Sequence, residues 1–223
     1  MATRVGVVLS GCGVFDGSEI HEAVSILLAL DRRGAQIICM APNIPQAGTV
    51  NHLVRKPDPH NRNVLEESAR IARGNIRDLA TVKADQLDAL IFPGGFGAAK
   101  NLCTFAADGP DCKVDPHVER LMLEMHAQKK PIGLACIAPV LAARVFGARN
   151  LKPTVTIGTD PATAQAVTAM NAVHQNTGPT DIAVDQANRL VTTPCYMTCS
   201  GPWAVYQGAE KMVEQVLRMA GQH

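Results

Sequence analysis

The stretch from residue 132 to residue 147 reads IGLACIAPVLAARVFG, and it decides the fold class. Its first four residues, Ile132 to Ala135, form a short apolar run that predicts a buried strand. Residues 137–146 carry apolar side chains at helical spacing and predict a helix. Because Cys136 is the only residue between the two, the stretch has the local pattern of a nucleophile elbow, in which a strand turns sharply into a helix.

The same alternation of short apolar runs with helical periodicity extends in both directions along the chain. It is typical of an α/β fold, in which helices cover both faces of a mostly parallel sheet. Strands are expected at residues 5–10, 36–40, 89–92, 154–157, 182–184 and 190–193. Helices are expected from Ile20 to about Gly34, over 64–73, from Pro116, from about Pro161, and over 203–219. No internal boundary is visible, so we expect one domain over residues 1–223.

Capping residues refine two of these helices. Asp16 precedes Glu19 by three residues, the spacing of a capping box at the start of the first helix. Asp115 followed by Pro116 is an N-cap with proline at the first helical position. Beyond this cap, four apolar residues at helical spacing predict the buried stripe of the helix: Val118, Leu121, Met122 and Met125.

The composition indicates a globular chain and excludes two classes of partner. The 223 residues are 47% hydrophobic and carry a net charge of +1. Binding to nucleic acid or to an anionic membrane would need a basic stripe, for which this charge balance gives no sign. The longest uncharged apolar stretch, residues 131–143, is shorter than the ~20 residues that span a bilayer. We therefore expect no nucleic-acid partner and no membrane partner.

The N-terminus and the cysteines predict a compartment. The first strand begins within five residues of Met1, which leaves no room for a signal sequence. The seven cysteines are an odd number without the spacing of a disulfide framework, so we expect reduced thiols. A cytoplasmic location is the resulting prediction. No metal site is expected, because Cys195 and Cys199 lack a second ligand pair and no two histidines stand four residues apart on one helix.

Two glycine-rich stretches resemble nucleotide-binding loops without matching them. Residues 11–17, GCGVFDG, are one residue too long for G-x-G-x-x-G, and residues 94–101, GGFGAAKN, lack the spacing and the Lys-Ser/Thr ending of a phosphate loop. The glycines instead suit a close approach of the backbone to a reacting group. The long connection at residues 43–63 is rich in Asn, Pro and His and is typical of a functional loop or an insertion.

Cys136 is the candidate nucleophile. A thiol at the start of a helix faces unpaired backbone N–H groups and the positive end of the helix dipole. Both favour the thiolate, so we expect the pKa of Cys136 to fall below the ~8.5 of a free cysteine. The alternative, which the pattern leaves open, is an inert cysteine buried as a small apolar residue.

Five strings along the chain carry a more specific signal. They are SGCGVFDGSEIHEA (10–23), RNVLEESARIARG (62–74), FPGGFGAAKNL (92–102), ACIAPVLA (135–142) and TTPCYM (192–197). Together and in this order they resemble the ElbB glyoxalase-like family, which belongs to the PfpI-like branch of the class I glutamine amidotransferase-like superfamily. The resemblance runs from residue 4 nearly to the C-terminus and implies a flavodoxin-like three-layer α/β sandwich.

The resemblance also implies a catalytic constellation. Cys136 corresponds to the elbow cysteine, and Glu22 falls where the branch places a glutamate whose carboxyl group meets that sulfur. Gly94, Gly95 and the backbone of Ile137 fall where the family holds amides for an oxyanion. Such a carboxyl group must be at least partly protonated to hydrogen-bond a thiolate, and burial raises a carboxyl pKa. The alternatives are an exposed helical carboxylate for Glu22 and an ordinary tight turn for the glycines.

One departure from the superfamily concerns histidine. Its hydrolases and amidotransferases supply a histidine after the elbow, but no histidine occurs between His126 and His174. His21 adjoins Glu22, yet neighbouring helical residues point in different directions. His174 could approach only through the fold. A Cys-His-Glu triad is therefore not expected, which weakens peptidase and glutaminase functions because amide cleavage needs a proton for a poor leaving group.

The resemblance implies a glutathione-independent, cofactor-free glyoxalase, formally a lyase, that converts glyoxal or a similar small 2-oxoaldehyde into the 2-hydroxy acid. The Cys136 thiolate would form a hemithioacetal, and Glu22 would move protons through an enediol to a thioester. Deglycase-type release of early glycation adducts would use the same groups. Two alternatives stay open: a redox-sensing stress-response binding protein whose Cys136 is oxidised, and a glutaminase-like subunit. By resemblance, the partners are a small aldehyde and a second copy in a homodimer.

Overall fold

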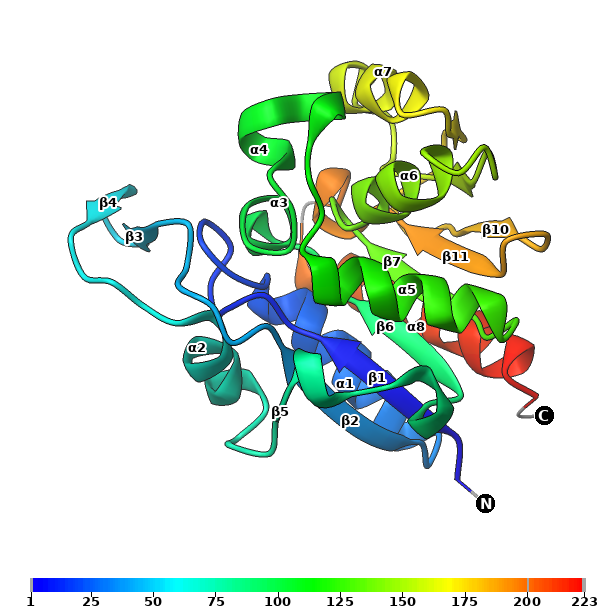
Figure 1. The fold of residues 1–223 in the computed structure, drawn as a ribbon, viewed down its shortest axis with the longest axis horizontal. Helices are drawn as coiled ribbons and strands as arrows, with labels where there is room; N and C mark the ends of the chain where they lie inside the picture. Colours follow the sequence, from blue (N-terminus) through cyan, green and yellow to red (C-terminus); the bar gives the residue numbers. More distant parts are fainter. Residues whose placement is uncertain (1, 200, 222–223) are drawn as a thin grey trace.

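The computed structural model describes residues 2–199 and 201–221, and its centre is a seven-stranded sheet (Figure 1). In chain order its strands are β1 (Arg4–Val8), β2 (Gln36–Ala41), β5 (Arg77–Asp78), β6 (Ala89–Phe92), β7 (Ile132–Ala135), β10 (Ala183–Asp185) and β11 (Leu190–Thr193). The spatial order is β10-β11-β7-β6-β1-β2-β5, and only β10 runs antiparallel to its neighbour within this described sheet. Strands β6, β7 and β11 are fully buried, which is why they read as continuous apolar runs.

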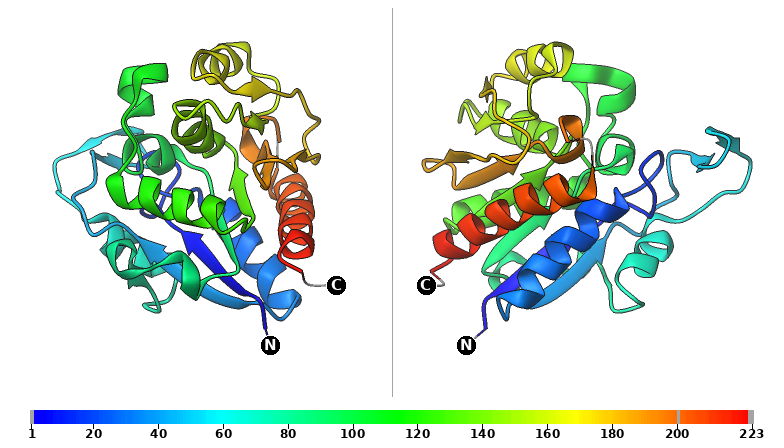
Figure 2. Two further views of the ribbon diagram at one scale, coloured as in Figure 1. Left: turned by 45° about the vertical axis from the view of Figure 1, so that its right-hand side comes forward. Right: turned by 180° about the vertical axis from the view of Figure 1, so that it is seen from behind.

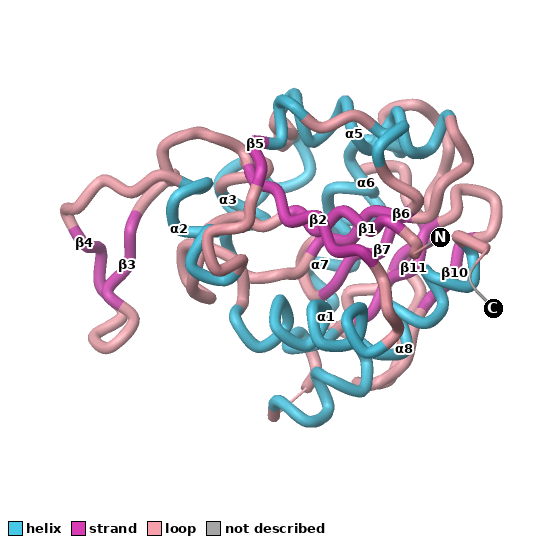
Figure 3. Tube along the Cα trace, turned by 90° about the horizontal axis from the view of Figure 1, so that it is seen from below, coloured by secondary structure: helices cyan, strands magenta, loops and turns pink. Residues whose placement is uncertain are grey.

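Helices cover both faces of this sheet and give three layers (Figure 3). On one face, α1 (Ile20–Arg32) and α8 (Pro202–Met219) lie side by side (Figure 2). On the other face lie α5 (Pro116–Ala127) and α6 (Pro139–Gly147). Each face has its own apolar core, one beneath α5 and α6 and one beneath α1 and α8. The flavodoxin-like three-layer α/β sandwich is therefore confirmed.

The cap predicted for α5 is present, whereas that predicted for α1 is not. The Asp115 carboxylate accepts hydrogen bonds from the N–H groups of His117 and Val118. At α1 the N-cap is Glu19, whose carboxylate accepts from the Glu22 N–H at 2.7 Å. The Asp16 carboxylate instead accepts a 2.7 Å hydrogen bond from the Val50 N–H, and this bond holds the 43–63 connection against the turn that precedes α1.

Short elements complete the chain. They are the hairpin β3 (Thr49–Asn51) and β4 (Lys56–Asp58), helix α2 (Val64–Ile71), helices α3 (Phe96–Lys100), α4 (Phe105–Asp108) and α7 (Pro161–Ala169), and strands β8 (Thr154–Val155) and β9 (Val173–His174). The strand expected at residues 154–157 is present as the shorter β8, which pairs with β9 in a separate two-stranded sheet rather than in the seven-stranded one. The 43–63 connection contains the β3–β4 hairpin, which projects from the body of the molecule (Figure 1).

None of the helices in the described ranges combines the length and apolar character needed to cross a bilayer.

Candidate active site

The turn between β7 and α6 holds Cys136 in a strained conformation. Its φ angle is +59°, in the left-handed region that side chains other than glycine rarely adopt. The Cys136 N–H donates to the Thr193 carbonyl at 2.9 Å, which fixes the turn to the end of β11. The side chain is almost completely buried. Strain of this kind persists only where surrounding contacts hold it, and it is common at functional sites.

The side chain of Glu22 meets Cys136 from the first turn of α1. Glu22 has no exposed surface, and its carboxyl group and the Cys136 thiol share a hydrogen bond. The two carboxyl oxygens also accept from backbone N–H groups, Oε2 from Gly94 at 2.9 Å and Oε1 from Tyr196 at 3.1 Å. The carboxyl group is therefore fixed by three elements of the fold: α1, the turn after β6 and the turn after β11.

The Gly94-Gly95 turn passes so close to this pair that side chains would not fit. A Cβ atom at Gly94 would lie 2.3 Å from the Cys136 Cβ and 2.6 Å from Glu22 Oε2. Gly95 has φ +95°, and a Cβ there would lie 2.3 Å from the Glu19 backbone nitrogen. The three predicted amides divide into two groups. The Gly94 N–H donates to Glu22, whereas the Gly95 and Ile137 N–H groups hydrogen-bond the Cys136 sulfur.

Burial controls the protonation of both groups. It raises the pKa of Glu22 to about 7 from an ordinary 4.5, against the opposing effect of the Tyr196 and Gly94 N–H groups. Burial first, and the charge of Glu22 second, raise the pKa of the Cys136 thiol well above its ordinary value. The expected fall of the thiol pKa is therefore wrong. Helix α6 begins only at Pro139, and the N–H groups of Gly95 and Ile137 do not offset the loss of water around the sulfur.

Cys136 lies at a cavity of about 390 Å³. Its lining consists of Val14, Glu19, Gly95, Phe96, Ala99, Phe105, Ala106, Cys136, Ile137, Thr163, Tyr196 and Met197. The walls are mostly apolar, with a few polar groups near the sulfur, which is typical of a small-molecule site. Cys136, Gly95 and Ile137 were predicted as site residues from the sequence, whereas Glu19, Phe96 and Tyr196 were not predicted to belong to the site.

A polar group of three side chains lies at the edge of this cavity. The Tyr196 hydroxyl shares a 2.7 Å hydrogen bond with His21 Nδ1, which lies 3.9 Å from Glu19 Oε1. Because Tyr196 also donates its backbone N–H to Glu22, one residue connects the buried carboxyl group with an exposed histidine. The sequence signal for Tyr196 was its place in the TTPCYM string directly after β11.

His174, the second histidine considered from the sequence, is not part of the lining of the Cys136 cavity. His174 lies in β9, where its Nε2 accepts from the Ile157 N–H at 3.3 Å and burial lowers its pKa. Among the described residues that line the cavity, none is a histidine. A Cys-His-Glu triad is accordingly not formed by the described residues.

Polar residues at the ends of the strands mostly support the loops. The Asn101 side chain donates to the carbonyls of Ser10 and Asp16 and accepts from the Ala47 N–H. Thr193 Oγ1 donates to the Asp181 carbonyl. Asn101 and Thr193 therefore hold neighbouring loops in place through hydrogen bonds to their backbone.

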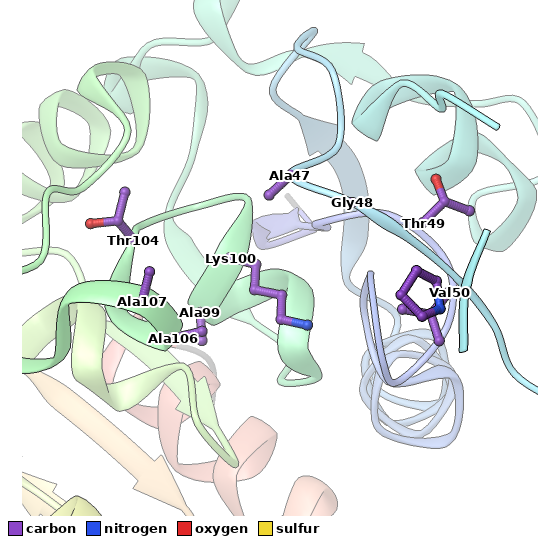
Figure 4. A pocket seen from close by; sticks show the side chains of 10 residues that line it. Ala47, Gly48, Thr49, Val50, Ala99, Lys100, Thr104, Ala106 and Ala107 are labelled. Carbon is purple, nitrogen blue, oxygen red and sulfur yellow. The ribbon is translucent and has the colours of Figure 1, made fainter. Parts of the chain in front are cut away.

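A second cavity of about 450 Å³ lies between the β3–β4 hairpin and α3–α4 and shares Ala99 and Ala106 with the first. Figure 4 shows Lys100 reaching from α3 toward the segment that carries Val50. Its ammonium group donates to the Phe15 carbonyl at 3.1 Å and supplies a positive charge to this second space.

Comparison with known proteins places the chain among named relatives. It is 50% identical to the rat ES1 protein homolog, mitochondrial, over 98% of this chain and 84% of that protein. It is 49% identical to the human glutamine amidotransferase-like class 1 domain-containing protein 3, mitochondrial, over 99% and 84%. No protein-family model matches the sequence. Because these relatives are mitochondrial proteins, the expectation of a cytoplasmic location is wrong.

Comparison with solved structures points to the same family. An Ehrlichia chaffeensis isoprenoid biosynthesis protein with an amidotransferase-like domain superposes with a TM-score of 0.92 at 34% identity, covering 98% of this chain and 99% of that one. Drosophila melanogaster DJ-1beta shares the fold, with a TM-score of 0.56 at 18% identity over 99% and 97% of the two chains. The chain belongs to the ES1 family of glutamine amidotransferase-like class 1 domain proteins, within the DJ-1/ThiJ/PfpI fold.

Proposed function

We propose that this protein is a cofactor-independent glyoxalase of the kind that its resemblance to the ElbB glyoxalase-like family implies. The substrate class is glyoxal or a similar small 2-oxoaldehyde. The observation that carries the proposal is the contact between the strained Cys136 thiol and the buried Glu22 carboxyl group at the cavity of about 390 Å³. Catalytic bases work best with a pKa near the working pH, and the pKa of Glu22 is about 7.

The first step is addition of the thiol to the aldehyde. Because burial holds the free thiol protonated, the sulfur attacks as its proton passes to the ionised Glu22 carboxylate. The new C–S bond converts the carbonyl oxygen into an oxyanion. The Gly95 and Ile137 N–H groups, which hydrogen-bond the sulfur in the free protein, lie beside it to stabilise this charge. Glu22 then returns the proton to oxygen and leaves a hemithioacetal.

The second step moves hydrogen between the two carbons of the adduct. The Glu22 carboxylate, again ionised, removes the proton from the carbon bonded to sulfur and gives an enediol. Protonation of the neighbouring carbon yields a thioester of the 2-hydroxy acid. Water then cleaves the C–S bond, which releases the acid and restores the thiol. For glyoxal the sum is glyoxal plus water giving glycolate and one proton, with no net oxidation.

The Tyr196–His21 pair supports this scheme as a route for proton exchange. The reaction releases one proton per turnover, and Glu22 is sealed from solvent. Tyr196 lines the cavity, and its hydroxyl shares the 2.7 Å hydrogen bond with the exposed His21. This pair, rather than a histidine beside the sulfur, gives protons a path out of the cavity.

The two alternative functions have weaker support. A redox sensor needs a stabilised thiolate, but burial raises the pKa of Cys136. A glutaminase needs a group that protonates the departing amine, and no histidine is present among the described residues lining the cavity.

The test is acid production from glyoxal without glutathione. We expect glycolate from the wild-type protein and a loss of at least about 100-fold in Cys136→Ser and in Glu22→Gln. Cys39→Ser is the matched control, because Cys39 is a nearly buried thiol in β2, outside the lining of the Cys136 cavity. Turnover that persists in Cys136→Ser would refute the mechanism, and absence of turnover from the wild type would refute the glyoxalase assignment.

A further inference from the structure

The segment between α3 and α5 holds a second pair of thiols, which the proposed reaction does not use. Cys103 and Cys112 are buried in the core beneath α5 and α6. Cys103 pairs with Val114 in an antiparallel bridge, and the Thr104 N–H donates to the Lys113 carbonyl at 2.9 Å. Residues diagonal across such a bridge lie on the same face, and Cys103 and Cys112 are a diagonal pair. Their thiols lie close enough to affect each other's pKa, and the Cys103 thiol donates a hydrogen bond to the Ala98 carbonyl at 3.4 Å.

The surroundings distinguish the two thiols. The contact with Cys103 and the nearby Arg144 guanidinium lower the pKa of Cys112 against burial and the Asp108 carboxylate, which raise it, whereas contact with Cys112 and burial raise the pKa of Cys103. Cys112 lies beneath a surface pocket of about 230 Å³ that is also lined by Lys113 and Arg144. The Arg144 guanidinium near this sulfur favours its thiolate, the form that reacts with oxidants, although the Glu119 carboxylate also lines the pocket.

The cover over this pair is thin. Helix α4 and the following turn, Gly109–Asp111, contain no buried residue. Opening them exposes Phe105, which is partly buried against the core, and no fully buried side chain of these two elements, so the cost in free energy is small compared with that of opening a core helix. The ends of the segment stay tied by the Cys103–Val114 bridge and by the Asp115 N–H, which donates to the Leu102 carbonyl at 2.8 Å. A small oxidant can thus reach Cys112 while the two cysteines keep their register.

We propose that Cys103 and Cys112 form a peroxide-reactive dithiol, in which Cys112 is the attacking and Cys103 the resolving thiol. The Cys112 thiolate attacks one oxygen of hydrogen peroxide, the O–O bond breaks, and sulfenic acid and hydroxide form. The Cys103 sulfur then displaces the hydroxyl group of the sulfenic acid, and its proton joins that group to leave as water. The sulfurs lose two electrons in total and one peroxide is reduced to two waters.

The disulfide would act on the walls of both cavities. It closes the segment at its base, and this segment carries Phe105 and Ala106 of the Cys136 cavity. Thr104, Ala106 and Ala107 of the same segment line the second cavity (Figure 4). Oxidation at Cys103 and Cys112 therefore restricts a wall that both cavities share.

The test uses the reduced full-length protein, as wild type and as Cys136→Ser to remove the other candidate thiol. Each is treated with one equivalent of hydrogen peroxide while folded, then unfolded in guanidinium with N-ethylmaleimide present so that every free thiol is blocked, and digested with trypsin. Both cysteines lie in one tryptic peptide, residues 101–113, NLCTFAADGPDCK. We expect this peptide to lose two hydrogen atoms and to carry no maleimide, and dithiothreitol to reverse both changes. Cys39, a nearly buried thiol whose pKa burial raises to about 11, should remain fully alkylated.

Two controls make the result specific. The protein unfolded in guanidinium measures the oxidation that closeness in sequence alone produces, and the folded protein must exceed it. In Cys103→Ser, dimedone should trap a sulfenic acid at Cys112, whereas Cys112→Ser should leave Cys103 a free thiol. A wild-type peptide with both cysteines alkylated after peroxide treatment, or folded protein no faster than unfolded, would overturn the proposal. Neither outcome depends on glyoxalase activity.

Discussion

At the scale of residues, the contact between Cys136 and Glu22 requires an unfavourable backbone conformation of the one and complete burial of the carboxyl group of the other. The cysteine keeps a left-handed backbone, and the carboxyl group has no contact with water. Neither would persist without the Gly94 and Tyr196 N–H groups that bind the carboxyl oxygens. The sequence predicted which residues meet, because the elbow and the glutamate lie in distinctive strings. It predicted the wrong direction for the thiol pKa, because that pKa depends on how deeply the sulfur is buried.

Gly94 makes the close contact possible, so Gly94→Ala should disrupt it. The added Cβ would lie 2.3 Å from the Cys136 Cβ, both on backbone that cannot move freely. We expect a loss of about 1–3 kcal/mol in the free energy of unfolding, measured with urea, together with loss of glyoxal turnover. Gly48→Ala is the control, since a Cβ added there would meet open space among the described residues, and it should stay within about 0.5 kcal/mol of wild type.

Tyr196→Phe tests the route for protons. The substitution removes the hydroxyl that bonds His21 and keeps the backbone N–H that bonds Glu22. We expect kcat for glyoxal to fall by up to about 100-fold, while the alkylation rate of Cys136 by iodoacetamide stays unchanged. Tyr206→Phe removes a hydroxyl that donates to Glu210 on the surface and should leave kcat unaltered. Equal kcat in the two variants would argue against the route.

At the scale of elements, the sequence predicted best what burial and capping determine locally. Strands β6 and β7 and the buried stripe of α5 lie where expected, because each is an apolar pattern bounded by strong turn or capping residues. The short strands β5 and β9 and the β3–β4 hairpin were not predicted. Each is two or three residues long, which is too short to leave a periodic signal. Strands β5 and β9 form through pairing with residues distant in sequence, whereas β3 and β4 pair with each other.

Asp115 tests the capping argument. Its carboxylate satisfies the N–H groups of His117 and Val118 at the start of α5. Asp115→Ala should lower the free energy of unfolding by about 1 kcal/mol, measured by urea denaturation. Asp111→Ala, at an exposed carboxylate in the Gly109–Asp111 turn, should change it by less than about 0.5 kcal/mol. Equal losses in the two variants would contradict the role of the cap.

At the scale of the whole molecule, the parallel sheet gathers the site from distant parts of the sequence. The turns after β6, β7 and β11 and the start of α1 meet at the carboxyl ends of the strands, where open α/β sheets carry their sites. The supporting loops reinforce this edge through Asn101 and Asp16. The homodimer implied by resemblance stays a prediction that sedimentation of the full chain would check.

The buried carboxyl group should also make global stability depend on pH. The folded pKa of Glu22 is about 7 against an ordinary 4.5, so the folded state binds more protons than the unfolded state between these values. The stabilisation is complete below pH 4.5 and is lost as the pH rises through 7. The shift corresponds to about 3 kcal/mol. Urea unfolding should show that wild type loses about this much relative to Glu22→Gln between about pH 4.5 and 8, and parallel pH profiles would contradict it.

The most direct test of the Cys136–Glu22 pair is the pH dependence of kcat/KM for glyoxal. Glu22 must be ionised to accept the thiol proton, so activity should fall tenfold per pH unit below a pKa of about 7. This acid limb should vanish in Glu22→Gln, whose residual activity should be low at every pH, and Cys136→Ser should be inactive throughout. Wild-type activity that stays level from about pH 5 to 8, or the same acid limb in Glu22→Gln, would contradict the assignment of Glu22 as the base.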